Sequence, residues 1–185
     1  RAWLAWWSLG ALAAAAAVAI VIWRGTRVAI ASAGSAAPYV ARITATKDAR
    51  WTKAVGVLPP GALLRMGRRL ELEQGIAEIT FDSGARVVLT GAAALDLNSA
   101  WDATLRRGTL TANVPREAIG FRISNSAVDV VDLGTEFSMV ANANGSADVF
   151  VLKGEVEAAP RVADAETIIL RENEARRFAV SGVSD

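Results

Sequence analysis

The stretch from Val130 to Val140 reads VVDLGTEFSMV and contains the residues of this chain that could most readily do chemistry. Asp132, Gly134, Thr135 and Glu136 interrupt an otherwise apolar run. A carboxylate, a glycine and a hydroxyl in this order suit a phosphate-binding loop or carboxylate-based hydrolysis. They also suit a strand that bends, because glycine lets another backbone approach closely. The surrounding elements must decide between these interpretations.

Asp-Leu-Gly-Thr is similar to the first phosphate loop of the actin and heat-shock-protein ATPases and, more loosely, to the Asp-x-Gly-Thr of an aspartic protease. The ATPase fold needs a second phosphate loop and two large subdomains. Only 50 residues follow Thr135, and none of them forms another Asp-x-Gly sequence. A motif without its structural context is weak evidence. We therefore expect the stretch to be architectural, with Asp132 as a solvated carboxylate at a strand end.

Composition narrows the chemistry further. The chain has no histidine and no cysteine, which excludes the usual zinc sites, Ser-His-Asp and Cys-His catalysis, and disulfides. The formal net charge is +1, and the basic residues occur as scattered pairs interrupted by acids rather than as a stripe that could follow nucleic acid. We expect a protein that is not an enzyme, uses no cofactor or metal, and does not bind nucleic acid.

Residues 2–23 predict a single transmembrane helix. They form a run of 22 uncharged residues with tryptophans at both ends. At about 1.5 Å per residue this run spans a hydrocarbon core of about 30 Å, and tryptophan favours the membrane interface. A signal peptide stays open as an alternative, because the small residues between Ala31 and Ala37 could be cleaved. The arginines that flank the helix, counted alone, would place the following domain in the cytoplasm.

Residues 24–50 are predicted to be a linker, with a fringe strand around residues 39–44, and residues 51–180 a β domain. After Trp51, short apolar alternations are separated by glycines such as Gly75, Gly84 and Gly108, a spacing typical of an all-β sandwich or barrel. The segment from Asp164 to Phe178 is the only contender for a helix and is ambiguous.

A first hairpin is predicted around the loop Asp82-Ser83-Gly84, with Gly84 in the left-handed conformation. This loop length places Phe81 opposite Ala85, Ile79 opposite Val87 and Ala77 opposite Leu89. All three pairs are apolar, so they would form the buried face.

A second hairpin is predicted with a two-residue turn at Asn144-Gly145. Phe137 would then face Leu152, Met139 would face Phe150, and Glu136 would face Lys153 as an ion pair. Asp132 to Thr135 would be the far end of the same strand. Gly134 and Gly154 would mark a bulge or a close backbone contact at the point where the ladder ends.

Five blocks of the sequence, in order, resemble the FecR domain, the periplasmic part of membrane-anchored sigma-factor regulators. They are LELEQGIAEITFDSGARVVLTGAAALDL from Leu70, LRRGTLTANVP from Leu105, GFRISNSAVDVVDLGTEF from Gly120, DVFVLKGEVEA from Asp148 and ILRENEARRF from Ile169. The resemblance implies a jelly-roll-like antiparallel β-sandwich preceded by one transmembrane helix.

The resemblance also implies a function in signal transduction at the cell envelope. The protein would be a single-pass inner-membrane regulator whose domain lies in the periplasm, despite the arginine count. It would sense a periplasmic or outer-membrane protein or a ligand, and it would act on a sigma factor through a cytoplasmic segment, a partner assigned by analogy alone. The alternative is a membrane-tethered envelope scaffold or glycan-binding module without a signalling role, because a fold does not by itself define a function.

Overall fold

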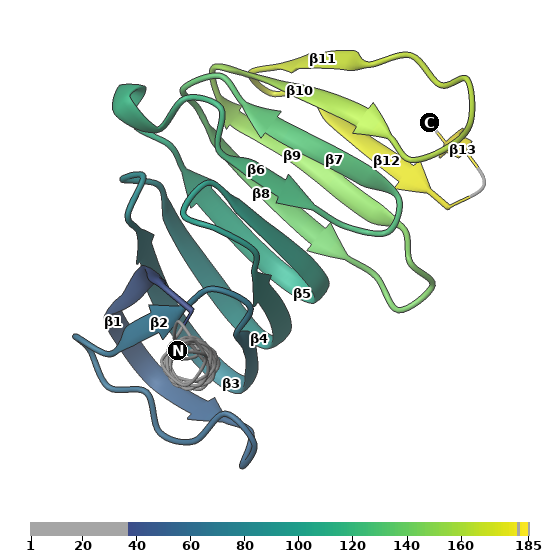
Figure 1. Cartoon of the computed structure of the whole chain (residues 1–185). Helices are drawn as coiled ribbons and strands as arrows, with labels where there is room; N and C mark the ends of the chain where they lie inside the picture. Colours follow the sequence, from purple (N-terminus) through teal and green to yellow (C-terminus); the bar gives the residue numbers. More distant parts are fainter. Residues whose placement is uncertain (1–36, 181, 185) are drawn as a thin grey trace, which may run out of the picture. The chain divides into compact units, whose positions relative to one another are not determined.

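The computed structural model describes residues 37–180 and 182–184, and within them the chain is built of β-strands with one short 3-10 helix, η1 (Arg116–Ala118) (Figure 1). The strands are β1 (Tyr39–Trp51), β2 (Leu63–Arg65), β3 (Arg69–Phe81), β4 (Arg86–Leu97), β5 (Asp102–Asn113), β6 (Arg122–Ser124), β7 (Val128–Asp132), β8 (Glu136–Ala141), β9 (Ala147–Lys153), β10 (Glu155–Pro160), β11 (Ile168–Arg171), β12 (Ala175–Ala179) and β13 (Gly182–Ser184). The all-β prediction is confirmed. The predicted transmembrane helix at residues 2–23 lies outside the described residues, none of which forms a helix long and apolar enough to cross a bilayer.

All strands belong to one mixed sheet that divides at β5. The first residues of β5 pair in parallel with β6, and its last residues pair antiparallel with β8. One branch, the first leaf, continues as β6-β7-β10-β11, and the other, the second leaf, as β8-β9-β12-β13. A purely antiparallel sheet was the wrong expectation. After β5 the chain passes through η1 and returns to the start of β5, where β6 pairs with it. A parallel pair of strands requires such a crossover connection.

The two leaves bury their apolar faces in one cluster. Val130 and Val156 from the first leaf and Phe137, Met139 and Phe178 from the second are fully buried members of it. At about 25 cal/mol per Å² of apolar area removed from water, this shared burial is the main force that holds the leaves together. Residues 37–185 therefore form one compact unit with its own core.

The predicted linker at residues 24–50 is too long at its C-terminal end. β1 begins at Tyr39 and pairs with β3 along most of its length, and it buries Val40, Ala41 and Ile43. β1 is rich in small residues and threonines, so its sequence shows no sustained alternation of apolar and polar residues. The neighbouring strand decides which of them are buried.

Two of the predicted punctuating glycines lie inside strands. Gly75 in β3 and Gly108 in β5 have φ of +86° and +90°, and the strand registers shift beside them. A Cβ on Gly75 would lie 2.2 Å from the carbonyl oxygen of Asp48, and one on Gly108 would lie 2.4 Å from that of Ala92. These glycines bend long strands at bulges instead of separating short ones.

The first predicted hairpin is confirmed in register and loop. Ala77 pairs with Leu89 and Ile79 with Val87. The amide of Phe81 donates to the carbonyl of Ala85 at 2.9 Å, and Gly84 has φ of +99°.

The second predicted hairpin is wrong by one residue. Phe137 pairs with Val151, and Met139 pairs with Val149. Phe150 is therefore paired with Ser138 on the outer face, with 37% of its surface exposed. The predicted partners Glu136 and Lys153 do face each other, because a bulge follows Glu136.

The turn explains the error. It is a three-residue loop closed by Asn142 and Ser146, with the amide of Gly145 donating to the carbonyl of Asn142 at 3.0 Å. Gly145 has φ of +85°, whereas Asn144 contributes its side chain, whose Oδ1 accepts from the amide and hydroxyl of Ser146 at 3.0 and 2.7 Å. Asparagine followed by glycine thus serves a three-residue loop as well as a two-residue one.

The ambiguous segment from Asp164 to Phe178 contains strands. β11 pairs with β10 in the first leaf, and β12 pairs with β9 in the second. The chain crosses between the leaves at residues 172–174.

Candidate functional site

The Asp132–Thr135 stretch is a corner at which the chain passes from one leaf to the other. β7 ends at Asp132 in the first leaf, and β8 begins at Glu136 in the second. The prediction that these residues are the far end of the β8 strand is therefore wrong, because the tertiary arrangement of the leaves ends β7 before the corner and starts β8 after it.

Asp132 closes this corner through its side chain. Oδ1 accepts hydrogen bonds from the amides of Gly134 and Thr135 at 2.6 and 2.8 Å, and Oδ2 accepts one from the hydroxyl of Thr135. Asp132 is completely buried, and Thr135 is 5% exposed. The expected solvated carboxylate is thus a buried clamp.

The electrostatics of Asp132 follow from that burial. Loss of solvent raises the pKa of its carboxyl, and the hydrogen bonds from Thr135 and Gly134 oppose the shift. Both carboxylate oxygens are occupied by the corner itself and are buried. The loop therefore presents no free carboxylate to a phosphate, a metal ion or a substrate.

Gly134 and Gly154 complete the corner. Gly134 has φ of +96°. Gly154, which alone separates β9 from β10, has φ of +84°, and a Cβ on it would lie 2.6 Å from Cγ2 of Thr135. A close contact does form at Gly154, but with the side chain of Thr135 rather than with the predicted backbone, and two passages between the leaves pack against each other there.

The hairpin tips at the opposite end of the leaves are also joined. The hydroxyl of Ser126, in the β6–β7 turn, donates to the carbonyl of Gly145 at 2.8 Å, and Nδ2 of Asn125 donates to the same oxygen at 3.4 Å. Asn144 and Gly145, which the sequence singled out, therefore have a structural role.

The outer face of the second leaf and its neighbouring strands offers a different kind of surface. One row of side chains runs across it in register, and it carries no charge: Val88, Thr111, Ser138, Phe150 and Ala175. Such a row of small, apolar and hydroxyl side chains resembles the core of a protein interface, where charged residues are depleted.

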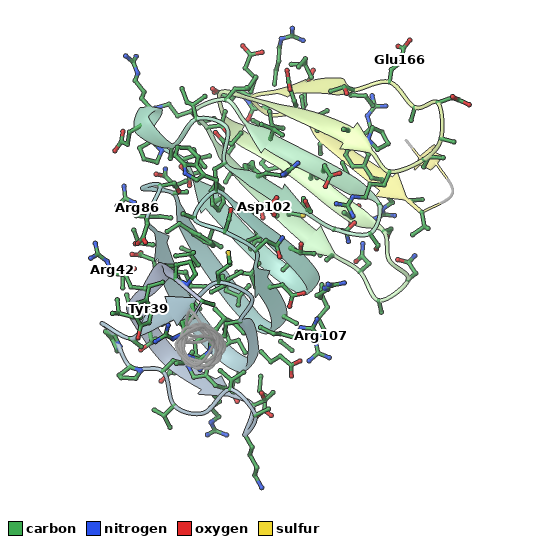
Figure 2. All side chains as sticks on the ribbon, in the orientation of Figure 1. Tyr39, Arg42, Arg86, Asp102, Arg107 and Glu166 are labelled. Atoms are coloured by element: carbon green, nitrogen blue, oxygen red, sulfur yellow. The ribbon has the colours of Figure 1, made fainter. Side chains whose placement is uncertain are left out.

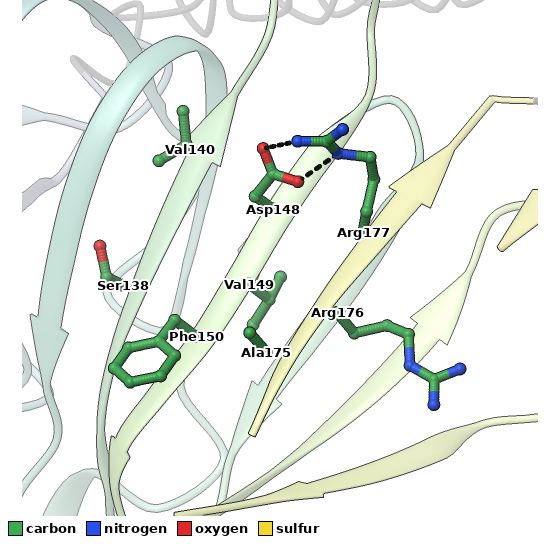
Figure 3. Close-up of a pocket in the computed structure, with 8 residues that line it drawn as sticks. All are labelled: Ser138, Val140, Asp148, Val149, Phe150, Ala175, Arg176 and Arg177. Atoms are coloured by element: carbon green, nitrogen blue, oxygen red, sulfur yellow. Dashed lines mark hydrogen bonds and ion pairs between the residues drawn. The ribbon is translucent and has the colours of Figure 1, made fainter. Parts of the chain in front are cut away.

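A groove of about 300 Å³ lies on this face (Figure 3). Ser138 and Val140 of β8, Phe150 of β9 and Ala175 of β12 line it. Its walls thus come from three neighbouring strands, and its largest apolar side chain is that of Phe150. We call it the outer groove.

An ion pair borders the outer groove at the end away from Phe150 (Figure 3). Nε of Arg177 lies 2.6 Å from Oδ1 of Asp148, and Nη2 lies 3.2 Å from Oδ2. The hydrogen bond from Arg177 holds the pKa of Asp148 below its ordinary value, against the opposing effect of burial. A fixed pair of opposite charges beside an apolar floor can orient a bound partner without changing the net charge of the groove.

The outer face of the first leaf and of the neighbouring parts of β3, β4 and β5 is polar. Asp96 accepts from Nε of Arg69 at 2.6 Å and from Nε of Arg106 at 2.7 Å. Asp129 accepts from Arg161 through both oxygens, at 2.6 and 2.9 Å. The hydrogen bond from Arg69 lowers the pKa of Asp96, with burial opposing and Arg106 assisting. These arginines are neutralised in place, so this polar face offers fewer unpaired charges than its sequence suggests.

The sequence interpretation missed the outer groove because its register turned Phe150 inward. The signal was present, since a three-residue loop at residues 143–145 places both Phe150 and Leu152 outside, and they are 37% and 40% exposed. Across residues 37–180 and 182–184 no group of three or more acidic side chains is placed to hold a metal ion.

A family model described as FecR protein matches residues 69–157. The match includes the corner, both hairpins and most of the outer groove. No curated protein matches the chain.

Two crystal structures of a proposed anti-sigma factor from Parabacteroides distasonis are similar, with TM-scores of 0.54 and 0.51 at 18% and 19% sequence identity. Each alignment covers 63% of this chain and 57% of the other, so the chain spans less than two thirds of the length of these neighbours. At this identity the likeness concerns the fold. The sequence blocks and the family match agree that the chain carries a FecR domain at residues 69–157.

Proposed function

We propose that the chain is a single-pass regulator of the bacterial inner membrane that controls a sigma factor. The observation that carries this proposal is the FecR match at residues 69–157. The likeness to a proposed anti-sigma factor supports it at the level of the fold. The apolar run at residues 2–23 would be the anchor, the β domain would lie in the periplasm, and a cytoplasmic segment would act on the sigma factor.

The two leaves would form a jelly-roll-like sandwich. Three passages between the leaves, at residues 132–136, at Gly154 and at residues 172–174, support this description, because bent strands that change sheet are how such sandwiches turn their corners.

The outer groove is the surface that we assign to a periplasmic protein partner. Phe150 supplies an exposed aromatic side chain, a residue type enriched where partners bind, and the row that includes Ser138 and Ala175 is uncharged. Asp148 and Arg177 would fix the orientation of the partner.

Transcription in the host bacterium tests the regulatory role. Deletion of the gene should change expression of one sigma-factor regulon, and the full-length gene should restore it. Ala175→Arg, which fills the outer groove from an exposed position, should restore basal control but not the response to the inducing condition. Ala163→Arg, an equally exposed substitution in the β10–β11 loop, is the matched control and should restore both.

The outcomes separate two claims. A deletion that changes no sigma-factor regulon contradicts the regulatory role. An Ala175→Arg strain that responds like the Ala163→Arg strain contradicts only the assignment of the outer groove.

Membrane topology has its own test. A fusion after Asp185 should be active as alkaline phosphatase and dark as a cytoplasmic fluorescent protein. The reverse pattern would place the β domain in the cytoplasm, and the periplasmic sensing role would then be untenable.

A second candidate is a membrane-tethered scaffold or glycan-binding module. An exposed aromatic ring beside a carboxylate and a guanidinium, as at Phe150, Asp148 and Arg177, is a combination that can hold a sugar. Binding of cell-wall glycan fragments that Phe150→Ala abolishes, together with an unchanged transcriptome in the deletion strain, would favour this candidate.

A further inference from the structure

Exposed side chains surround the point at which the chain enters the β domain. The carbonyl of Ala37 accepts from Nη1 of Arg65 at 2.7 Å, and the carbonyl of Pro38 accepts from the amide of Met66 at 2.8 Å. β2 thus holds the entering chain in place. We call the exposed side chains around this point the entry patch: Tyr39, Arg42, Leu63, Arg65, Met66 and Arg86.

The entry patch exposes apolar and aromatic surface. Tyr39 is 46% exposed, Leu63 is 54% exposed and Met66 is 41% exposed. The guanidinium of Arg65 lies 4.3 Å from the ring centroid of Tyr39 and donates to its hydroxyl at 3.0 Å. A tyrosine with an arginine stacked on it has an apolar body and a polar, charged tip, the combination that favours a membrane–water interface.

Two further arginines lie in line with this surface. Arg42 pairs with Leu63 of β2 on one side and with Thr80 of β3 on the other, and Thr80 pairs with Arg86 of β4. Tyr39, Arg42 and Arg86 lie along one side of the unit (Figure 2). The entry patch therefore extends across four neighbouring strands.

The arginines of the entry patch differ from those of the polar face described above, which are paired with aspartates. Arg69, Arg122 and Arg161 each pair with an aspartate. Within residues 37–180 and 182–184, Arg42 and Arg86 have no carboxylate partner.

Acidic residues lie around the entry patch without forming ion pairs with its arginines. Asp82 lies near it, its amide bonded to the carbonyl of Val40, and Glu78 accepts the hydroxyl of Thr44. Glu117 lies beside Gly84 of the β3–β4 hairpin, and Glu136 lies across Asn113 from Arg86. The positive character of the entry patch therefore rests on three arginines that do not pair with a carboxylate among the described residues.

The position of the entry patch along the chain selects its partner. In the proposed function the anchor ends at Trp23, so 13 residues, 24–36, separate it from the β domain. Fully extended, they reach at most about 45 Å. The tether therefore keeps the entry point within about 45 Å of the bilayer, so an attractive surface around that point is always within reach of lipid.

We propose that the entry patch docks on the anionic phospholipid surface of the membrane that anchors the chain. Tyr39, Leu63 and Met66 enter the headgroup region, and the three arginines face the lipid phosphates. Each basic residue near such a surface strengthens binding about five-fold, so the three together contribute on the order of 100-fold. Docking would hold the domain in one orientation and leave the outer groove open to a periplasmic partner. This inference rests on the membrane anchor of the proposed function.

Site-specific fluorescence in nanodiscs tests the proposal, and the absence of native cysteine makes the labelling clean. The full chain carries Leu63→Cys with a bimane label, in discs of phosphatidylcholine with or without phosphatidylglycerol and with a nitroxide at the lipid headgroup. The label should be quenched in discs that contain phosphatidylglycerol and much less in phosphatidylcholine alone. A label at Glu166→Cys, in the β10–β11 loop away from the entry patch, should not be quenched in either (Figure 2).

Charge variants complete the test. Replacement of Arg42, Arg65 and Arg86 together by glutamine should abolish the quenching at position 63. Arg107→Gln, an exposed arginine of β5 outside the entry patch, should preserve it. Circular dichroism should show the same β content in all variants.

Five results would overturn the proposal. Quenching that is equal at positions 63 and 166, or that is independent of phosphatidylglycerol, excludes lipid docking by the entry patch. Protection of the label by an added periplasmic protein in discs without anionic lipid would assign the patch to a protein partner instead. A chain that does not co-purify with the discs contradicts the anchor as well as the docking, whereas co-purification without quenching contradicts the docking alone.

Discussion

Substitutions of Asp132 separate the role of its shape from the role of its charge. In Asp132→Ala the amide and hydroxyl of Thr135 lose their acceptors at a position that is 5% exposed, where water does not readily replace them. Each buried donor left without a partner costs about 1–3 kcal/mol. The amide of Gly134 lies in an exposed residue and can bond to water. We therefore expect Asp132→Ala to lower the free energy of unfolding by about 2–5 kcal/mol.

Asp132→Asn should cost far less. Its Oδ1 can still accept from the amides of Gly134 and Thr135, and the hydroxyl of Thr135 can rotate to accept from the new amide nitrogen. We expect a change of less than about 1 kcal/mol at neutral pH, because a neutral side chain also avoids the burial of a charge.

The pH dependence has a defined sign. Burial raises the folded-state pKa of Asp132 above the ordinary value of 3.8. The stability that this shift contributes is fully present below the ordinary pKa and is lost as pH rises through the folded-state pKa. The wild type should therefore lose stability relative to Asp132→Asn over that interval.

Urea unfolding of a fragment of residues 37–185, followed by tryptophan fluorescence at several pH values, measures these differences. Trp51 packs against the core and reports on global unfolding. If Asp132→Asn is as destabilised as Asp132→Ala at neutral pH, the corner needs the negative charge and the reasoning from hydrogen-bond geometry fails.

The remaining predictions concern a glycine, a register and an ion pair. Gly154→Ala should destabilise the domain by about 1–3 kcal/mol more than Gly120→Ala in the same urea assay. Both glycines have positive φ, but only at Gly154 would the new Cβ lie within 3 Å of another atom, Cγ2 of Thr135. Equal losses of stability would show that this contact is unimportant. Cross-strand NMR contacts should pair the backbone of Ser138 with that of Phe150, and contacts that place Phe150 opposite the next residue along β8 would restore the register inferred from a two-residue turn. The pKa of Asp96 is lowered in the folded state, so its contribution to stability is present above the ordinary pKa and is lost as pH falls through the folded-state pKa. In Asp96→Asn the free energy of unfolding should therefore fall less steeply as the pH is lowered. An unchanged slope would contradict a stabilising role for the hydrogen bonds from Arg69 and Arg106.

The sequence by itself determined the fold class, the family and the first hairpin. Alternation between Ala77 and Leu89 with a loop ending in Gly84 fixes both register and buried face, because a slip of one residue would turn every side chain over. The first four of the five ordered blocks coincide, to within one residue, with the FecR match at residues 69–157, and the fifth lies beyond it.

The sequence could not determine the second hairpin, because its local signal fits two loops. Asn144-Gly145 supports a two-residue turn or the end of a three-residue turn, and both place apolar side chains opposite one another. The β5 strand decides between them, since β8 must turn Phe137 and Met139 toward the shared core. Phe150 then faces outward, and the outer groove forms as a consequence.

At the candidate site, too, the sequence predicted the local geometry, and the tertiary structure decided what is buried. Types and spacing at Asp132, Gly134 and Thr135 predicted a bend or a close contact, and that much is a local property of glycine beside polar residues. Whether Asp132 is solvated or buried depends on Gly154 and on the strands of both leaves, which lie far from it in the sequence. Burial is a property of what packs against a residue, so only the tertiary structure decided that this carboxylate is a clamp and that a groove forms on the outer face of β8, β9 and β12.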